Sequence, residues 1–146
     1  MPEIEYVEDR MESEELLERL CPPVRNWFKD KFPDFTEPQK VAIPRILNGE
    51  HLLLCSPTGS GKTLTAFLTI IDDLVRRSLD GSLPDAVQCV YISPIKALAN
   101  DIEKNLMGPL GEIKERYLPS RAKEIKVGLR TGDTPQSERE KMLRKP

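Results

Sequence analysis

The chain has 146 residues, of which 38% are hydrophobic and 32% charged, and its formal net charge is −2. This length suits one domain or part of one, and the small net charge excludes nucleic-acid binding through bulk positive charge. No apolar stretch approaches the roughly 20 residues that cross a bilayer, and the acidic start does not resemble a signal peptide. Cys21, Cys55 and Cys89 lack metal-ligand spacing, which excludes a disulfide framework or a zinc site. We therefore expect a soluble, intracellular (cytoplasmic) protein without a membrane partner.

Charge is unevenly distributed along the chain. Residues 1–20 contain eight acidic and two basic side chains, whereas residues 114–146 contain ten basic and five acidic ones. Each region is most simply a solvated helix face. The basic region would contribute to nucleic-acid binding only if its neighbours do so too. We expect residues 1–23 to form an acidic N-terminal helical segment that precedes a domain over residues 24–146.

Three helices are predicted before the first strand. Ser13 can cap a short helix that Pro22-Pro23 ends, and a second apolar stripe at helical spacing runs from Val24 to Phe32. Thr36 then opens a third helix, which Asn48-Gly49 closes.

Strands and helices alternate in the rest of the chain. Short apolar runs predict three strands, at residues 51–55, 87–92 and 125–129. Each is followed by a predicted helix: one with an apolar face over residues 64–75, one over 95–106, and one that opens at Thr134-Pro135. This order predicts an α/β fold with a parallel sheet and right-handed crossovers. The loops that begin at Ser56, Ser93 and Arg130 should then share one rim, where ligands bind.

The first of these loops has the sequence of a P-loop. Ser56-Pro57-Thr58-Gly59-Ser60-Gly61-Lys62-Thr63 lies between an apolar strand and an amphipathic helix, the context that such a loop requires. The glycines let backbone N–H groups approach phosphate oxygens, and the helix N-terminus favours anions. Lys62 can reach the β- and γ-phosphates of ATP, and the Thr63 hydroxyl can bind Mg²⁺. The alternative is a glycine-rich turn that binds nothing.

Ser56 replaces the first glycine of the general P-loop pattern, which disfavours nucleotide kinases and small GTPases and fits the [AS]-x-T-G-x-G-K-T loop of superfamily 2 helicases. Residues 32–44, with Thr36-Glu37-Pro38-Gln39, resemble the Q-motif of these helicases. Residues 90–106 resemble motif Ia, in the form found in the Lhr (large helicase-related) group. Residues 130–146 resemble the segment upstream of that group's T-T-P-E motif. The chain is thus similar to the Lhr group over about residues 24–146.

The resemblance implies roles for matching residues. Gln39 would hydrogen-bond adenine with its amide, although Thr36 and Gln39 also have capping-box spacing, in which Gln39 only closes a helix start. Backbone contacts to a nucleic-acid strand are implied for two groups, Pro94, Lys96, Ala97 and Asn100, and Arg130, Thr131, Gly132 and Thr134. The alternatives are a solvated lysine at position 96 and a turn that caps the last helix at 130–134.

The D-E-x-[HD] motif II of these helicases does not occur in the chain, and Asp72-Asp73 lies on the P-loop helix instead. We therefore expect the N-terminal portion of a RecA-like P-loop NTPase domain, with a three-layer αβα arrangement around a parallel sheet, truncated before the motif II strand. Such a portion should expose unpaired strand edges and self-associate.

The resulting hypothesis is the ATP-binding and nucleic-acid-tracking part of an ATP-dependent helicase, which alone binds but does not hydrolyse ATP. ATP and Mg²⁺ are the expected cofactors. The expected partners are single-stranded or tailed duplex nucleic acid, DNA rather than RNA, and the remaining domains of the same polypeptide. The alternatives are a P-loop nucleotide or small-molecule kinase and a non-catalytic ATP-binding module.

Overall fold

The computed structural model describes residues 3–93 and 102–144. Its helices are α1 (Ser13–Arg19), α2 (Pro22–Lys31), α3 (Glu37–Leu47), α4 (Lys62–Asp80), the π-helical turn η2 (Glu103–Met107), α6 (Gly108–Tyr117) and α7 (Gln136–Arg144). None of the helices in these residues is long and apolar enough to cross a membrane.

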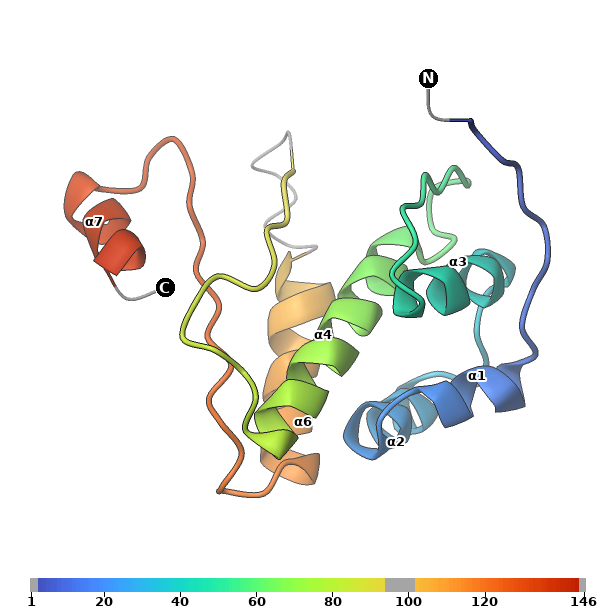
Figure 1. Cartoon of the computed structure of the whole chain (residues 1–146), viewed down its shortest axis with the longest axis horizontal. Helices are drawn as coiled ribbons and strands as arrows, with labels where there is room; N and C mark the ends of the chain where they lie inside the picture. Colours follow the sequence, from blue (N-terminus) through green and yellow to red (C-terminus); the bar gives the residue numbers. More distant parts are fainter. Residues whose placement is uncertain (1–2, 94–101, 145–146) are drawn as a thin grey trace.

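Helix α4 is the centre of the molecule. Figure 1 shows it crossing the middle of the view, with α1, α2 and α3 on one side and, on the other, the extended chain that follows α4 and the extended chain that leads into α7. It packs against α2, α3 and η2, and α6 packs against α2. The predicted apolar face explains this position, because Leu68, Ile71 and Val75 recur at helical spacing and are fully buried.

One hydrophobic core joins the helices. Residues from α1, α2, α4 and α6 contribute to it, including Leu16, Val24, Phe28, Leu68 and Ile113. The rings of Phe28 and Phe35 stack with centroids 4.1 Å apart. Since Leu16 lies in this core, α1 packs against the body of the protein despite the acidic composition of its surroundings.

The structure differs from the prediction at the three strands. No strand is assigned within residues 3–93 and 102–144, and the segments 52–55, 87–92 and 125–129 lie without regular pairing. A strand exists only where its N–H and C=O groups pair with a neighbouring strand. The apolar side chains that would face such a sheet are therefore largely exposed, with Leu53 at 84% and Ile92 at 85%.

The helix predicted over residues 95–106 lies mostly outside the described residues. Its described end is η2, which continues into α6, a helix that the sequence analysis did not predict. Gly108 and Pro109 stand at the start of α6, and Pro is tolerated there because the first N–H groups of a helix have no partner within it. The last predicted helix is confirmed as α7, which begins at Gln136, one residue after Pro135.

Candidate functional site

The P-loop residues form a tight turn at the start of α4. Gly59 and Gly61 have φ angles of 82° and 86°, in the left-handed region that favours glycine. The Ser60 N–H donates to the Pro57 carbonyl at 3.3 Å, and the hydroxyls of Ser56 and Ser60 lie 2.6 Å apart. These bonds close residues 56–60 into a ring of backbone directly in front of the helix.

Lys62 is the first residue of α4, and its side chain folds back over this ring. Its Nζ donates to the Pro57 carbonyl at 2.9 Å and also to the Ser56 carbonyl. The ammonium therefore lies against the loop carbonyls. The first N–H groups of α4, which have no partners within the helix, directly follow the loop in the chain. Thr63 is half-buried at the next position. A positive side chain, a helix N-terminus and a glycine-rich turn together form a site that suits an anion.

Helix α3 holds the P-loop from one side. The Thr36 hydroxyl donates to the Ser60 carbonyl at 2.8 Å, and Gln39 Nε2 donates to the Gly61 carbonyl at 3.4 Å. The Gln39 Oε1 accepts the Thr36 N–H at 2.9 Å, which forms one half of a capping box. The capping role left open for Gln39 is thus present in the structure, and the same amide contacts the P-loop.

The contact between α3 and the loop also explains Gly61. A Cβ atom at this position would lie 2.7 Å from Gln39 Nε2, and Gln39 is buried. Glycine is required here for its backbone angle and also for the space that it leaves. The contact from Thr36 to Ser60 was not predicted, although the capping box already placed this hydroxyl at the start of α3.

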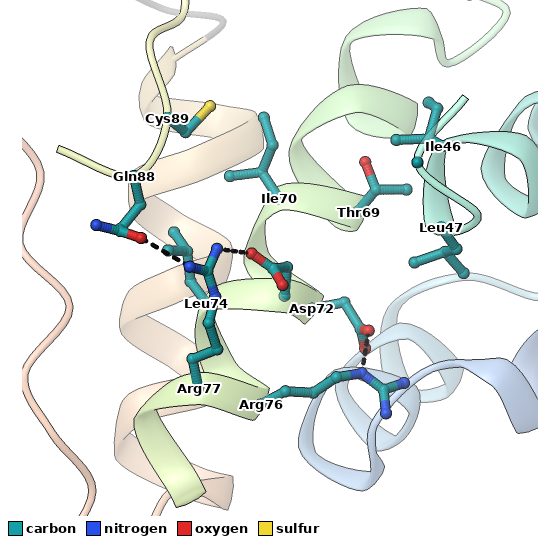
Figure 2. A pocket seen from close by; sticks show the side chains of 12 residues that line it. Ile46, Leu47, Thr69, Ile70, Asp72, Leu74, Arg76, Arg77, Gln88 and Cys89 are labelled. Atoms are coloured by element: carbon teal, nitrogen blue, oxygen red, sulfur yellow. Dashed lines mark hydrogen bonds and ion pairs between the residues drawn. The ribbon is translucent and has the colours of Figure 1, made fainter. Parts of the chain in front are cut away.

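The two adjacent acids of α4 are held in ion pairs. Asp72 is fully buried, accepts the Cys21 N–H at 2.6 Å and pairs with Arg76 at 2.6 Å. Asp73 pairs with Arg77, whose guanidinium also donates to Gln88 at 2.7 Å. These side chains line a cavity of about 420 Å³ along the middle of α4. Figure 2 shows Ile46 and Leu47 on the side of this cavity opposite Arg77 and Gln88. Asp72 therefore joins α4 to the start of α2 through the Cys21 N–H, whereas the pair of Asp73 with Arg77 lies within α4.

The loop before α7 is organised by a single arginine. The Thr131 N–H donates to the Thr134 hydroxyl at 2.8 Å, which closes a turn over these residues. Arg139, in α7, donates to the carbonyls of Thr134, Gly132 and Thr131 at 2.8, 2.9 and 3.3 Å. Arg130 is exposed beside this turn. The turn that the sequence analysis named as the alternative is therefore formed.

The other predicted nucleic-acid contacts, Pro94, Lys96, Ala97 and Asn100, lie outside the described residues. In Figure 1 the P-loop, the end of the segment 87–93 and the loop before α7 all lie toward the upper side of the view. The P-loop and the loop before α7 lie at separate places in this view, and since the described residues form no sheet, the common rim stays a prediction.

Comparisons with known proteins agree with this arrangement. A model of the DEAD/DEAH box helicase family matches residues 36–146. An ATP-dependent helicase Lhr-Core of Methanocaldococcus jannaschii is 45% identical over 148 residues, which cover 100% of this chain and 18% of the relative. A protein of the same description from Methanothermobacter thermautotrophicus is 54% identical over 128 residues, or 87% of this chain and 15% of the relative.

A solved structure also matches, that of the Mycobacterium smegmatis helicase Lhr bound to ssDNA and AMP-PNP. Its TM-score is 0.74 at 41% identity, over 90% of this chain and 16% of that protein. The chain thus spans less than a fifth of the length of these relatives, and the likeness supports a RecA-like helicase fold. The chain belongs to the DEAD/DEAH box helicase family and is similar to its Lhr members.

Proposed function

We propose that this chain is the ATP-binding and nucleic-acid-tracking part of an ATP-dependent helicase. The observation that carries this proposal is the P-loop, in which Lys62, the α4 N-terminus and two left-handed glycines converge within the region that matches the helicase family. Such a helicase couples ATP hydrolysis to translocation along a strand and to unwinding.

In the proposed nucleotide site, residues 56–63 surround the phosphates. The Lys62 ammonium exchanges its two carbonyl partners for the β- and γ-phosphates, which is favourable because a charged acceptor forms the stronger hydrogen bond. The Thr63 hydroxyl is a suitable oxygen ligand for Mg²⁺, which is commonly bound between a protein side chain and substrate phosphates. This ion neutralises phosphate charge when it is bound.

Gln39 is buried beneath the P-loop, so contact with adenine requires the loop to move away from its amide, which has hydrogen-bonding capacity to spare. One amide hydrogen and one lone pair are used by Gly61 and Thr36, and an amide offers two of each. The remaining donor and acceptor match the N7 and N6 positions of adenine. The same side chain contacts the P-loop. Binding of the base by Gln39 would therefore also affect how the P-loop holds the phosphates.

The proposed nucleic-acid site consists of Arg130, Thr131, Gly132 and Thr134, together with Pro94, Lys96, Ala97 and Asn100. Arg130 is exposed, and an arginine side chain is suited to phosphate contacts that do not depend on sequence. The M. smegmatis helicase Lhr is bound to ssDNA in its structure, which supports DNA as the strand that is tracked here.

We also propose that the extended segments become strands of a parallel sheet, in a three-layer domain that begins near residue 24 and includes other parts of the polypeptide. Their exposed apolar side chains support this, since a sheet would cover them. An acidic motif II is absent from the sequence, so we propose that this chain alone binds ATP without hydrolysing it.

Calorimetric titration with Mg-ATP and Mg-GTP tests the nucleotide site. We expect ATP to bind, GTP to bind at least about tenfold more weakly, Lys62→Ala to abolish binding, and Gln39→Ala to remove the preference for ATP. The Lys62→Ala variant should keep the melting temperature of the parent chain. Equal affinity for both nucleotides in the parent chain would leave Gln39 as a helix cap only. Binding that survives Lys62→Ala would refute the phosphate site.

A further inference from the structure

The loop at residues 131–134 contains no apolar side chain that could hold it in place by packing. Gly132 and Asp133 are exposed and Thr131 and Thr134 half-buried, and α7, which follows the loop, has no buried residue among those described. Exposed loops with few apolar contacts are normally mobile. Here, however, its polar groups are bonded within the loop and to one side chain of α7, Arg139.

The contacts of Arg139 use the shape of its guanidinium. Its Nε and Nη2 atoms bond carbonyl oxygens of three loop residues, Thr131, Gly132 and Thr134. The planar fork of arginine can hold several acceptors in one fixed arrangement, whereas a lysine ammonium acts as a single point charge. The Arg139 N–H also joins the first turn of α7 to Pro135, which brings the side chain back over the loop.

These contacts change what the loop offers to an anion. A carbonyl oxygen carries partial negative charge and would repel a phosphate. Because the three loop carbonyls are bonded to the Arg139 cation, they no longer oppose the approach of a phosphate. The Thr131 and Thr134 hydroxyls are tied to each other and to loop N–H groups, which fixes the loop before any ligand arrives. Order that exists before binding lowers the entropic cost of binding.

We propose that Arg139 is a positioning residue for nucleic-acid binding. Its guanidinium holds the carbonyls of the loop and thereby fixes the turn beside Arg130, whose exposed side chain would contact the phosphates of a single strand. This inference rests on the proposed nucleic-acid role of the loop. Arg139 is not one of the residues predicted to contact the strand, and it acts by holding those residues in place.

The test measures binding of fluorescein-labelled oligodeoxythymidine to this chain by fluorescence anisotropy. We expect Arg139→Ala to weaken binding about tenfold or more, the range for loss of hydrogen bonds to a charged group. Arg139→Lys keeps the charge but not the fork, so it should recover only part of the affinity. Lys141→Ala is the matched control, because it removes one exposed positive charge from the same helix. It should change affinity by less than about threefold, since salt screens exposed charges.

Two further measurements distinguish a positioning role of Arg139 from a general loss of structure in its variants. Amide hydrogen exchange in residues 131–134 of the free protein should accelerate in Arg139→Ala and stay unchanged in Lys141→Ala and Arg130→Ala. Affinity for Mg-ATP should be the same in all four variants, because the P-loop lies at a separate place in the molecule (Figure 1).

The outcomes distinguish the two proposals. Full recovery by Arg139→Lys, or an effect of Arg139→Ala no larger than that of Lys141→Ala while Arg130→Ala weakens binding, would overturn the positioning role and leave the nucleic-acid site intact. If the parent chain does not bind the oligonucleotide, or if Arg130→Ala and Thr131→Ala bind like the parent, the nucleic-acid role of the loop fails and the positioning role fails with it.

Discussion

The helical body, which consists of α1 to α4, η2 and α6, and the three extended segments at residues 52–55, 87–92 and 125–129 use apolar residues in opposite ways. In the helical body, Leu16, Phe67 and Ile113 are buried, whereas Leu53 and Ile92 in the extended segments are among the most exposed apolar residues. A helix satisfies its backbone groups within itself and needs only a surface to pack on, whereas a strand needs a neighbour for both purposes. Stability of the described structure should therefore come from the helical body.

The largest expected effect on stability comes from shortening a buried side chain in the helical body. Leu68→Ala should lower the free energy of unfolding by about 2–5 kcal/mol, because it removes buried methyl groups and leaves a cavity. Leu68 is fully buried in α4. Leu53→Ala in the first extended segment is the matched substitution and should cost less than about 0.5 kcal/mol. Urea denaturation of both variants measures the difference, and comparable losses would show that the extended segments are packed in solution.

A smaller effect is expected where the two regions meet, at the P-loop. Gly61→Ala should cost about 1–3 kcal/mol, because alanine is strained at a φ of 86° and its Cβ would collide with Gln39. Gly59→Ala has a similar φ of 82° but nothing within 4 Å of the added atom, so it isolates the backbone strain. The double variant Gly61→Ala, Gln39→Ala should lose less stability than the sum of the two single changes, since the collision is removed. Strict additivity in denaturation experiments would contradict the contact between α3 and the loop.

Cys21 in the helical body and Cys55 in the first extended segment allow the two regions to be compared by the pH dependence of stability. Burial raises the pKa of the Cys21 thiol from 9.0 to about 12, with a further contribution from Asp72. In the unfolded chain this thiol loses its proton near pH 9, while in the folded chain it keeps the proton up to about pH 12. The unfolded state then binds fewer protons, so the free energy of unfolding should fall as pH rises above 9, by at most about 1.4 kcal/mol per pH unit.

Below pH 9 the Cys21 thiol is protonated in both states and contributes no pH dependence. Cys21→Ala should therefore flatten the stability profile between about pH 9 and pH 10.5, where the thiol has lost its proton in the unfolded chain and keeps it in the folded chain. Cys55→Ala, at an exposed position in the first extended segment, should leave the slope of the parent chain. Thermal denaturation across this range tests the prediction, and a slope that persists in Cys21→Ala would assign it to other groups.

The same contrast explains which features the sequence could predict. The position of α4 follows from its continuous apolar face, and the P-loop follows from a local pattern of glycine, lysine and threonine. Helix α6 was missed because Gly108 and Pro109 are typical of a helix end, yet they stand in its first turn, where their cost is small. The bonds from Arg139 to the loop depend on how the chain turns between residues 131 and 139, which no local spacing specifies. The strands depend on partners, and a single sequence does not show which segments supply them.

The smallest effect on stability, and the last prediction, concerns the exposed side of the extended segments. Apolar residues that lie beside unpaired backbone favour association between chains. We expect sedimentation velocity to show a weight-average mass that rises with protein concentration, and Ile92→Lys to reduce this rise. Because Ile92 is 85% exposed, the substitution should change the free energy of unfolding by no more than about 0.5 kcal/mol. Ser137→Lys in α7 introduces the same side chain and the same change in charge at an exposed polar position, and so controls for charge. A parent chain that sediments as a monomer at all concentrations would mean that the extended segments are protected in solution. An equal reduction by both variants would assign the association to charge instead of to the exposed apolar side chains of the extended segments.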